Sequence, residues 1–444
     1  MKRIIINSIL LLLLHITVCA QETSSYSLQQ SIDIALANNI SVKQNGLLAE
    51  AAGVNLKQAK TNIFPDLNAS LEHGMNKGRS IDPFSNTYVN QSVNYAGYGL
   101  NMGLVLFNGM TLQNNIRQQS FAYDASKMEW QQAKDNLVLL VMFAYLQILN
   151  NEDLLTSAGV QKELSAKQLE RLQILDSQGA ISPAQLADVK GQLMSDELNI
   201  LDIKNNLETS KLALAQLMNV PYNKMMKLER MNTDEFLTAY KNSSDEIYQT
   251  ALKEFALIKS VELRKRSAEY ALKSAKGARY PSLVLGSNLQ TNYSSIAQNS
   301  TGKIPYSEQI GNNVFSTVSL GLRIPLFNAY RAKYNIRLAG INVRNTKLQE
   351  ENTKLQLRHQ IEQAYLNMTN AFERYTALLE QVAAYNISFK AAEARFAAGV
   401  GTSVDYLIAK NNSDRANISL IGSKYDFVLR KKVLDYYQNA MDVK

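Results

Sequence analysis

The residues that could carry acid–base, nucleophilic or metal chemistry are few and widely spaced in this sequence. The chain of 444 residues contains one cysteine, Cys19, and three histidines, His15, His73 and His359. A disulfide framework or a multi-cysteine zinc site requires more thiols than this. Neither His73 nor His359 has a cysteine or a second histidine near it in the sequence. We therefore predict that the protein is not an enzyme and that it has no catalytic site, metal site or cofactor.

Two other features that suggest chemistry have simpler explanations. Gly97-Tyr98-Gly99 is glycine-rich, but the Gly-Lys-Ser or Gly-Lys-Thr of a phosphate-binding loop does not follow it. The formal net charge of +8 could attract nucleic acid, yet no basic cluster stands out along the chain. We interpret the charge as a solvated surface and expect no nucleic-acid partner.

Residues 1–20 have the pattern of a secretory signal peptide. Lys2 and Arg3 give the positive start, residues 4–14 give the apolar stretch, and small residues follow that suit cleavage. The apolar stretch is shorter than the ~20 residues of a membrane-spanning helix. A lipoprotein signal is the alternative, so whether Cys19 is lipidated or removed stays open. Both interpretations predict an exported protein.

The exported part of the sequence repeats itself once. Residues 63–67 resemble residues 279–283, an offset of 216 residues, and residues 106–108 match residues 326–328, an offset of 220. Further short matches follow in the same order along the chain, and such collinearity is typical of an internal repeat. The predicted division is a first repeat, an equatorial connector and a second repeat: residues 21–220, 221–243 and 244–444.

Each repeat is predicted to run helix, β-hairpin, long helix, helix. Glycines gather and charges thin out in two windows, which we interpret as the β-hairpins: residues 66–109 and 282–327. Prolines are absent from two long stretches in which apolar residues recur at three- and four-residue spacing, 110–178 and 328–398. A helix of ~70 residues would be roughly 105 Å long. Shorter helices are expected at 27–62, 182–219, 244–278 and 402–440.

Strand-like alternation gives each predicted hairpin one apolar and one polar face. We expect the apolar face to contact lipid, through Leu100, Met102, Leu104, Leu320, Leu322 and Ile324. We expect the polar face to line a pore, through Arg323, Asn288 and Gln290, because an arginine facing lipid near the midplane costs about 2–4 kcal/mol. Some nearby tyrosines could form an interfacial aromatic girdle: Tyr88, Tyr95, Tyr98, Tyr293 and Tyr306.

Four strands with one apolar face cannot stand alone in a bilayer, because an open edge leaves backbone groups unpaired at several kcal/mol each. Three chains would close a barrel of 12 strands, an even number as in bacterial barrels. The predicted fold class is mainly α with membrane β: a trimeric 12-stranded β-barrel, four strands per chain, continuous with a long α-helical barrel. The alternative is a periplasmic structural coiled-coil or adaptor-like protein without a channel, which would leave the apolar strand face uncovered.

Two sequence motifs and the repeat carry a resemblance to a known family. Residues 324–328 read Ile-Pro-Leu-Phe-Asn before a long helix, and residues 398–407 read Ala-Gly-Val-Gly-Thr-Ser-Val-Asp-Tyr-Leu. With the repeat, they resemble the TolC-like outer-membrane efflux proteins. The resemblance implies a homotrimer in the outer membrane of a Gram-negative bacterium, with its helical part in the periplasm. It also implies a periplasmic adaptor (membrane fusion) protein and an inner-membrane transporter as partners, in tripartite efflux or type I secretion of a substrate that these residues do not identify.

The resemblance gives a role to the two turns that follow the long helices. It implies that they form the periplasmic tip, gate and adaptor contact, through Gly179, Ser182, Pro183, Gly399, Gly401, Thr402 and Asp405. Asp405 matches an acidic position at the family's entrance and is either a first-turn helix carboxylate or part of a ring of three. Because no arginine directly follows Thr402, and Pro183 replaces an acid of some relatives, we do not expect a salt-bridged lock there.

Overall fold

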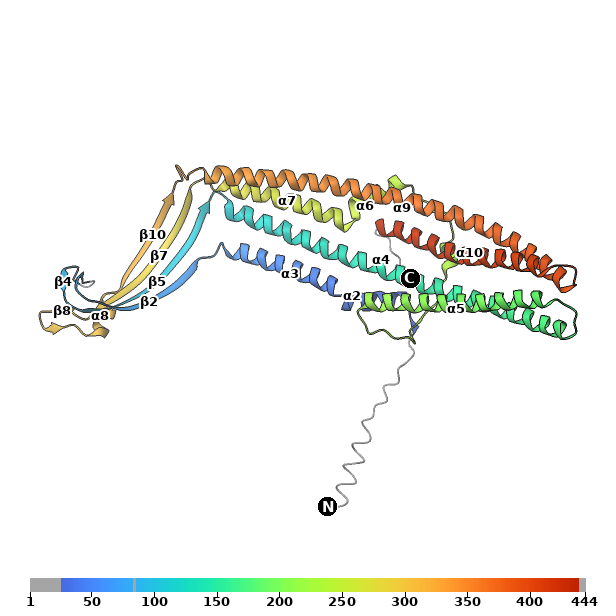
Figure 1. Cartoon of the computed structure of the whole chain (residues 1–444). Helices are drawn as coiled ribbons and strands as arrows, with labels where there is room; N and C mark the ends of the chain where they lie inside the picture. The colour runs from blue at the N-terminus through green and yellow to red at the C-terminus, as the bar shows by residue number, and fades with distance from the viewer. Residues whose placement is uncertain (1–24, 83–84, 439–444) are drawn as a thin grey trace, which may run out of the picture. The chain divides into compact units, whose positions relative to one another are not determined.

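The computed structural model describes residues 25–82 and 85–438, so the predicted signal peptide lies outside the described residues. The described chain is mostly helical (Figure 1). Its α-helices are α2 (Leu28–Asn38), α3 (Ile40–Thr61), α4 (Thr111–Ser177), α5 (Pro183–Met218), α6 (Ser244–Glu254), α7 (Ala256–Gly277), α8 (Tyr306–Asn312), α9 (Arg331–Ala397) and α10 (Ser403–Tyr437). Its strands are β1 (Ser25–Tyr26), β2 (Asp66–Asn76), β3 (Arg79–Ile81), β4 (Tyr88–Asn90), β5 (Val93–Asn108), β6 (Lys227–Leu228), β7 (Ser282–Ser294), β8 (Gln298–Asn299), β9 (Gly302–Lys303) and β10 (Phe315–Arg323).

The chain divides into two compact units, and each takes pieces from both predicted repeats. One unit contains residues up to 44, 131–255 and 356–444, and the other contains residues 45–130 and 256–355. The second unit holds the four-stranded sheet, whereas the first holds the turns after α4 and α9. The repeats describe the organisation of the sequence and stay a prediction. The two compact units divide the chain differently, because they reflect which segments pack against each other.

The two long helices are confirmed, since α4 and α9 contain 67 residues each. The shorter helices predicted at 27–62 and 244–278 are each interrupted by one extended residue, Asn39 and Phe255, with ψ of 124° and 125°. Asn39 also caps the start of α3, because its Oδ1 accepts hydrogen bonds from the backbone N–H groups of Ser41 and Val42 at 3.0 and 3.3 Å. Each of these segments thus becomes two consecutive helices.

Capping boxes start both of these helix pairs. Ser27 Oγ accepts the N–H of Gln30 at 3.2 Å, and Gln30 Oε1 accepts the N–H of Ser27 at 3.0 Å. Ser243 and Glu246 repeat the arrangement before α6, at 3.4 and 2.8 Å. Each box satisfies two N–H groups that a helix start leaves without an intrahelical partner. Equivalent residues therefore begin equivalent helices in the two halves of the sequence.

Residues 131–177 of α4 contribute a buried face to the core of the unit that holds the turns. Leu137, Val141, Tyr145 and Ile148 are buried at three- and four-residue spacing, whereas Leu140 is 53% exposed. One 18-residue window of α4 is apolar enough to span a membrane, yet 56% of it is buried within the protein. Packing inside the unit explains that apolar stretch.

The predicted connector contains β6 and a short 3₁₀ helix, η2 (Thr233–Phe236). Strand β6 pairs in parallel with β1. The hydroxyl of Tyr145 donates hydrogen bonds to the carbonyl oxygens of Tyr26 and Glu229, at 3.1 and 2.6 Å. Burial of this hydroxyl raises the pKa of Tyr145 to about 12. The connector is therefore anchored to α4, which its polar sequence did not reveal.

The four long strands form one antiparallel sheet in the order β10-β7-β5-β2 (Figure 1). The last strand ends at Arg323, so Ile324, predicted to be a strand residue, lies just outside it. The loops of the two hairpins carry elements that we did not predict: the pair β3–β4, the pair β8–β9 and α8. The loop of the first hairpin touches the end of β7, because the hydroxyl of Ser294 contacts the buried carboxylate of Asp82.

Candidate functional site

The register of the sheet sorts the predicted strand residues onto two faces. Directly paired residues share a face and neighbours along a strand alternate, so pairing identifies each side chain's face. One face carries Leu100, Met102, Leu104, Leu320 and Leu322. The opposite face carries Arg323, Asn288 and Gln290. Two of the hydrophobic side chains on the apolar face, Leu71 and Val318, are 76% and 73% exposed, so the chain by itself leaves that face uncovered.

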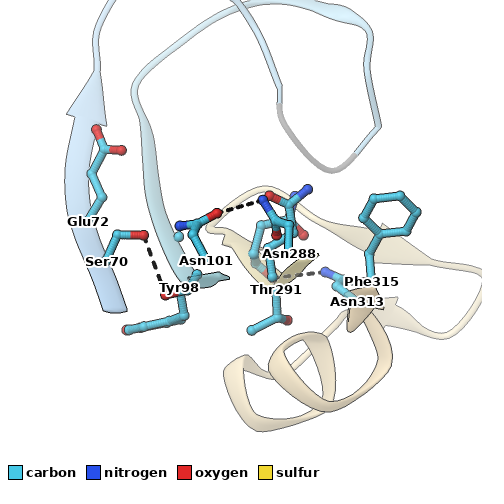
Figure 2. Close-up of a pocket in the computed structure, with 12 residues that line it drawn as sticks. Ser70, Glu72, Tyr98, Asn101, Asn288, Thr291, Asn313 and Phe315 are labelled. Carbon is cyan, nitrogen blue, oxygen red and sulfur yellow. Dashed lines mark hydrogen bonds between the residues drawn. The ribbon is translucent and has the colours of Figure 1, made fainter. Parts of the chain in front are cut away.

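Every glycine of these four strands lies on the polar face. The register places there Gly74, Gly97, Gly99, Gly103, Gly286 and Gly321. Above Gly97 a side chain would meet nothing within 4 Å. The polar face is accordingly hollowed, with Asn101 and Asn288 standing in the hollow and Glu72 and Phe315 toward its two ends (Figure 2).

Tyrosines gather at one end of the apolar face. Tyr98 and Tyr293 lie on that face, and Tyr306 of α8 contacts both of them. The rings of Tyr293 and Tyr306 are 4.8 Å apart between centroids. Tyr95 instead lies on the polar face and donates a hydrogen bond to Glu72 at 3.0 Å. Three of the five predicted girdle residues therefore come together at the apolar face.

Glycine ends both long helices in the same way. Gly179 and Gly399 have φ of 67° and 76°, a conformation that favours glycine. The next residue donates its N–H five positions back, from Ala180 to Leu175 at 2.9 Å and from Val400 to the carbonyl of residue 395 at 3.1 Å. This is the Schellman arrangement, which satisfies carbonyl groups at a helix end. The turns after α4 and α9 are thus built alike.

The helices after these turns begin at capping residues. Pro183 is the first residue of α5, and the N–H of Ser182 donates to Oε1 of Gln185 at 3.3 Å. Thr402 caps α10, since its Oγ1 accepts the N–H of Asp405 at 3.1 Å. The Thr402 hydroxyl in turn donates to Oδ2 of Asp405 at 2.7 Å. The carboxylate of Asp405 therefore supports the helix start, and it remains exposed.

The two turns are joined within one chain. Gly401 fits closely against the end of α9, because a Cβ there would lie 3.1 Å from the backbone nitrogen of Phe396. Arg171 of α4 donates to the carbonyl of Ala397 at 2.6 Å, and Ser403 donates to Asp188 of α5 at 3.0 Å. Beneath these bonds lies a small apolar core: Leu172, Val189, Phe396 and Tyr406. The two turns are thus held together by contacts of the helices that flank them.

A family profile described as outer membrane efflux protein matches residues 31–220 and 247–434, which is most of the chain. The chain belongs to the outer membrane efflux protein family. Outer membrane protein TolC of Salmonella enteritidis is 20% identical over 412 residues, which cover 92% of this chain and 81% of that protein. Toxin and drug export protein A of Aggregatibacter actinomycetemcomitans is 20% identical over 404 residues, covering 90% and 83%.

Two solved channel structures share the fold. CusC superposes with a TM-score of 0.80 at 18% identity, covering 93% of this chain and 91% of CusC. The CmeC outer membrane channel of Campylobacter jejuni superposes with a TM-score of 0.78 at 19% identity, covering 93% and 86%. The efflux protein is an outer-membrane exit duct of an efflux system, with its helical part in the periplasm. Members of the family are channels, which favours the channel over the adaptor-like alternative.

Next to its tip, the efflux protein buries a charged cluster that the sequence did not reveal to us. Lys410 of α10 is fully buried, and its Nζ lies 2.6 Å from Oδ2 of Asp414 and 3.2 Å from Oδ2 of Asp196 on α5. Asp196 also accepts hydrogen bonds from Ser165 of α4 at 2.6 Å and from Gln192 at 2.8 Å. Helices α4, α5 and α10 therefore meet at one buried ion pair.

A signal for this cluster was present in the sequence. Ser403, Tyr406, Lys410 and Ser413 recur at three- and four-residue spacing and form one buried face of α10. A lysine on such a face requires an acidic partner, because burial of an unpaired charge is costly. Its partner on the same helix, Asp414, follows four residues later. The partner on α5 could not be identified, because sequence alone does not give the register between two helices.

We predict that replacement of Lys410 by methionine destabilises the unit that contains the tip by about 3–5 kcal/mol, because the buried carboxylate of Asp196 and the half-buried carboxylate of Asp414 lose their counter-cation. Burial raises the pKa of Asp414 and Lys410 opposes that rise. Without Lys410 the folded-state pKa moves further above the unfolded one, so stability falls as pH rises through that window. Thermal melts followed by circular dichroism should therefore show a larger deficit at pH 8 than at pH 5.

The matched control is Lys167→Met, which removes an ion pair with Glu163 whose side chains are 71% and 66% exposed. Exposed pairs contribute little, so this variant should melt like the wild type at both pH values. If Lys410→Met also melts like the wild type, the buried pair is not stabilising the tip.

Proposed function

We propose that three copies of the efflux protein close a 12-stranded barrel in the outer membrane, continuous with an α-helical barrel, and that the tips meet a periplasmic adaptor and an inner-membrane transporter. The observation that carries this proposal is the sheet itself. Within the described residues β2 and β10 are its outermost strands, so each offers a row of backbone groups to a further strand. In hydrocarbon such rows must be paired.

The number of strands in the proposed barrel follows from the need for a lumen wide enough for a substrate. Two copies would give eight strands, and a barrel of that size is filled by its own side chains. Three copies give 12 strands, with room for a lumen. In that barrel the apolar face contacts lipid through Leu100, Met102, Leu104, Leu320 and Leu322, with Ile324 at the rim. Arg323, Asn288 and Gln290 then face the lumen.

The helices also present surfaces suited to further copies of the chain. On α9, Ile341, Leu348 and Leu355 are 45%, 64% and 57% exposed and recur every seven residues. Seven-residue spacing of apolar side chains is typical of a seam between packed helices. Association of three copies would cover this seam in the unit that also holds the sheet.

At the tip, an apolar stripe remains exposed beside Asp405. Val400 lies in the turn, and Val404 and Ile408 lie four residues apart on α10; the three are 77%, 57% and 56% exposed. Such a stripe suits the packing of a partner helix, and we assign it, with the two turns, to the adaptor. Three copies of Asp405 would form a ring of carboxylates that favours cations at the entrance.

Cross-linking of the outermost strands tests the trimer directly. We predict that Asn68→Cys on β2 together with Thr317→Cys on β10, treated with a flexible bismaleimide in outer membranes, yields covalent trimers on a denaturing gel. The control pair, Asn101→Cys with Asn288→Cys, joins paired positions of one chain and should stay monomeric. The parent chain, treated with the same bismaleimide, is the control for cross-links that do not involve the introduced cysteines. Its own Cys19 lies in the predicted leader. Monomers from both pairs would contradict closure.

Substitutions at two neighbouring residues of β10, one apolar and one charged, test which face of the sheet contacts lipid. We predict that Leu322→Arg impairs assembly of heat-modifiable trimers much more than Arg323→Leu, because an arginine facing lipid costs up to about 2–4 kcal/mol. Both residues are exposed in the single chain and lie on opposite faces. Equal damage from the two substitutions would mean that the lipid and lumen faces are wrongly assigned.

The ring of carboxylates is tested by Asp405→Asn, which keeps a side-chain oxygen for the Thr402 hydroxyl. We predict that single channels in planar bilayers lose part of their cation preference and their block by multivalent cations. Thr402→Ser, which keeps the capping hydroxyl and the Asp405 charge, should leave both unchanged. If the Asp405 variant forms trimers with unaltered selectivity and block, Asp405 serves the helix start and not the entrance.

A further inference from the structure

The hollow on the polar face opens above Gly97 of β5, where a Cβ would meet nothing within 4 Å, whereas Ser70 Oγ would lie 2.8 Å from a Cβ at the neighbouring Gly99. Gly97 pairs with Glu72 on β2 and with Asn292 on β7, and Gly99 pairs with Ser70 and Gln290. Each glycine is therefore flanked on both sides by polar side chains while contributing none itself. The resulting hollow has a volume of about 360 Å³. That lies within the range of small-molecule sites, roughly 300–1,000 Å³.

The hollow is lined by amide side chains, each of which both donates and accepts hydrogen bonds. Asn288 donates from Nδ2 to Oδ1 of Asn101 at 2.9 Å, so the two amides stand together in Figure 2. The Oδ1 of Asn288 is buried, and among the described residues no group donates a hydrogen bond to it. A buried acceptor without a partner costs free energy, so turning the Asn288 amide toward a ligand hydroxyl in the hollow would be favourable.

The two ends of the hollow add one charge and one ring. Glu72 stands at the end formed by β2, and its carboxylate accepts the Tyr95 hydroxyl. Phe315 stands at the end formed by β10, with its side chain 57% exposed (Figure 2). Amides, a single carboxylate and an exposed aromatic ring together suit a neutral ligand that has many hydroxyl groups and one apolar face.

We propose that this hollow binds a neutral saccharide. Its pyranose hydroxyl groups would exchange hydrogen bonds with Asn101, Asn288 and Gln290, and its apolar C–H face would lie on the ring of Phe315. The inference rests on the proposed function, because it places the hollow on the lumen side of a closed barrel, and it deepens that function by naming a substrate class. Three copies of the site would then line one level of the pore.

The test uses the full-length trimer and maltohexaose as the probe. In planar bilayers, maltohexaose added to both compartments should interrupt the current of the wild-type channel. Gly97→Val fills the hollow without a clash, since nothing lies within 4 Å of its new Cβ, and should weaken the block by about tenfold or more. Gly321→Val is the matched control, because it adds the same side chain to the same face outside the hollow, and should keep wild-type block.

A second pair of variants separates hydrogen bonding from shape. Asn288→Leu should weaken maltohexaose binding by about tenfold or more, whereas Asn68→Leu, on the same face but outside the lining, should not. Saturation-transfer NMR on the detergent-solubilised protein measures the same binding without a conducting channel. A conducting wild-type channel that shows neither block nor binding overturns the saccharide site and leaves the proposed function intact. Equal losses in Gly97→Val and Gly321→Val also overturn it, whereas a wild type that binds but never conducts contradicts the channel.

Discussion

Pairing of the backbone groups at the two outer strands is the constraint on which the rest of the structure depends. A strand in hydrocarbon has no water to satisfy its N–H and C=O groups, so a membrane sheet has to close on itself. One chain contributes four strands and leaves β2 and β10 outermost in the described sheet. The proposed closure by further copies would then decide what the other surfaces must be. The sheet needs one apolar face, and the helices need apolar seams such as that of Ile341, Leu348 and Leu355.

The tip depends on a different balance, in which polar groups are buried to fix how helices meet. The apolar core beside Tyr406 is small, and the contacts around it are directional: Arg171 with a helix-end carbonyl, Ser403 with Asp188, and Lys410 with Asp196. A buried ion pair adds little net stability compared with apolar packing, but it is strongly unfavourable to separate. Such a pair fixes one arrangement of α4, α5 and α10, where a purely apolar contact would tolerate sliding.

Local signals made most of the fold predictable from the sequence. Glycine at a helix end and a capping residue at the next start act within a few residues, so the ends of α4 and α10 were predicted to within about three residues. Strand alternation likewise placed Leu322 and Arg323 on opposite faces, as the register has them. The breaks at Asn39 and Phe255 were missed because one extended residue hardly disturbs a helical pattern. Contacts between distant segments, such as Tyr145 with Glu229 or Lys410 with Asp196, have no local signal at all.

The distribution of glycine distinguishes the two faces of the sheet. All six glycines of the four long strands lie on the polar face, although alternation alone would allow them on either. On the concave side of a barrel, side chains converge, so large residues there would fill the interior. Glycine lowers the stability of a strand interior, and this cost falls on the face that the proposed barrel would have to keep open. Beside Gly74 the Tyr95 ring occupies the vacant space, whereas above Gly97 it stays empty, and the hollow arises from that difference.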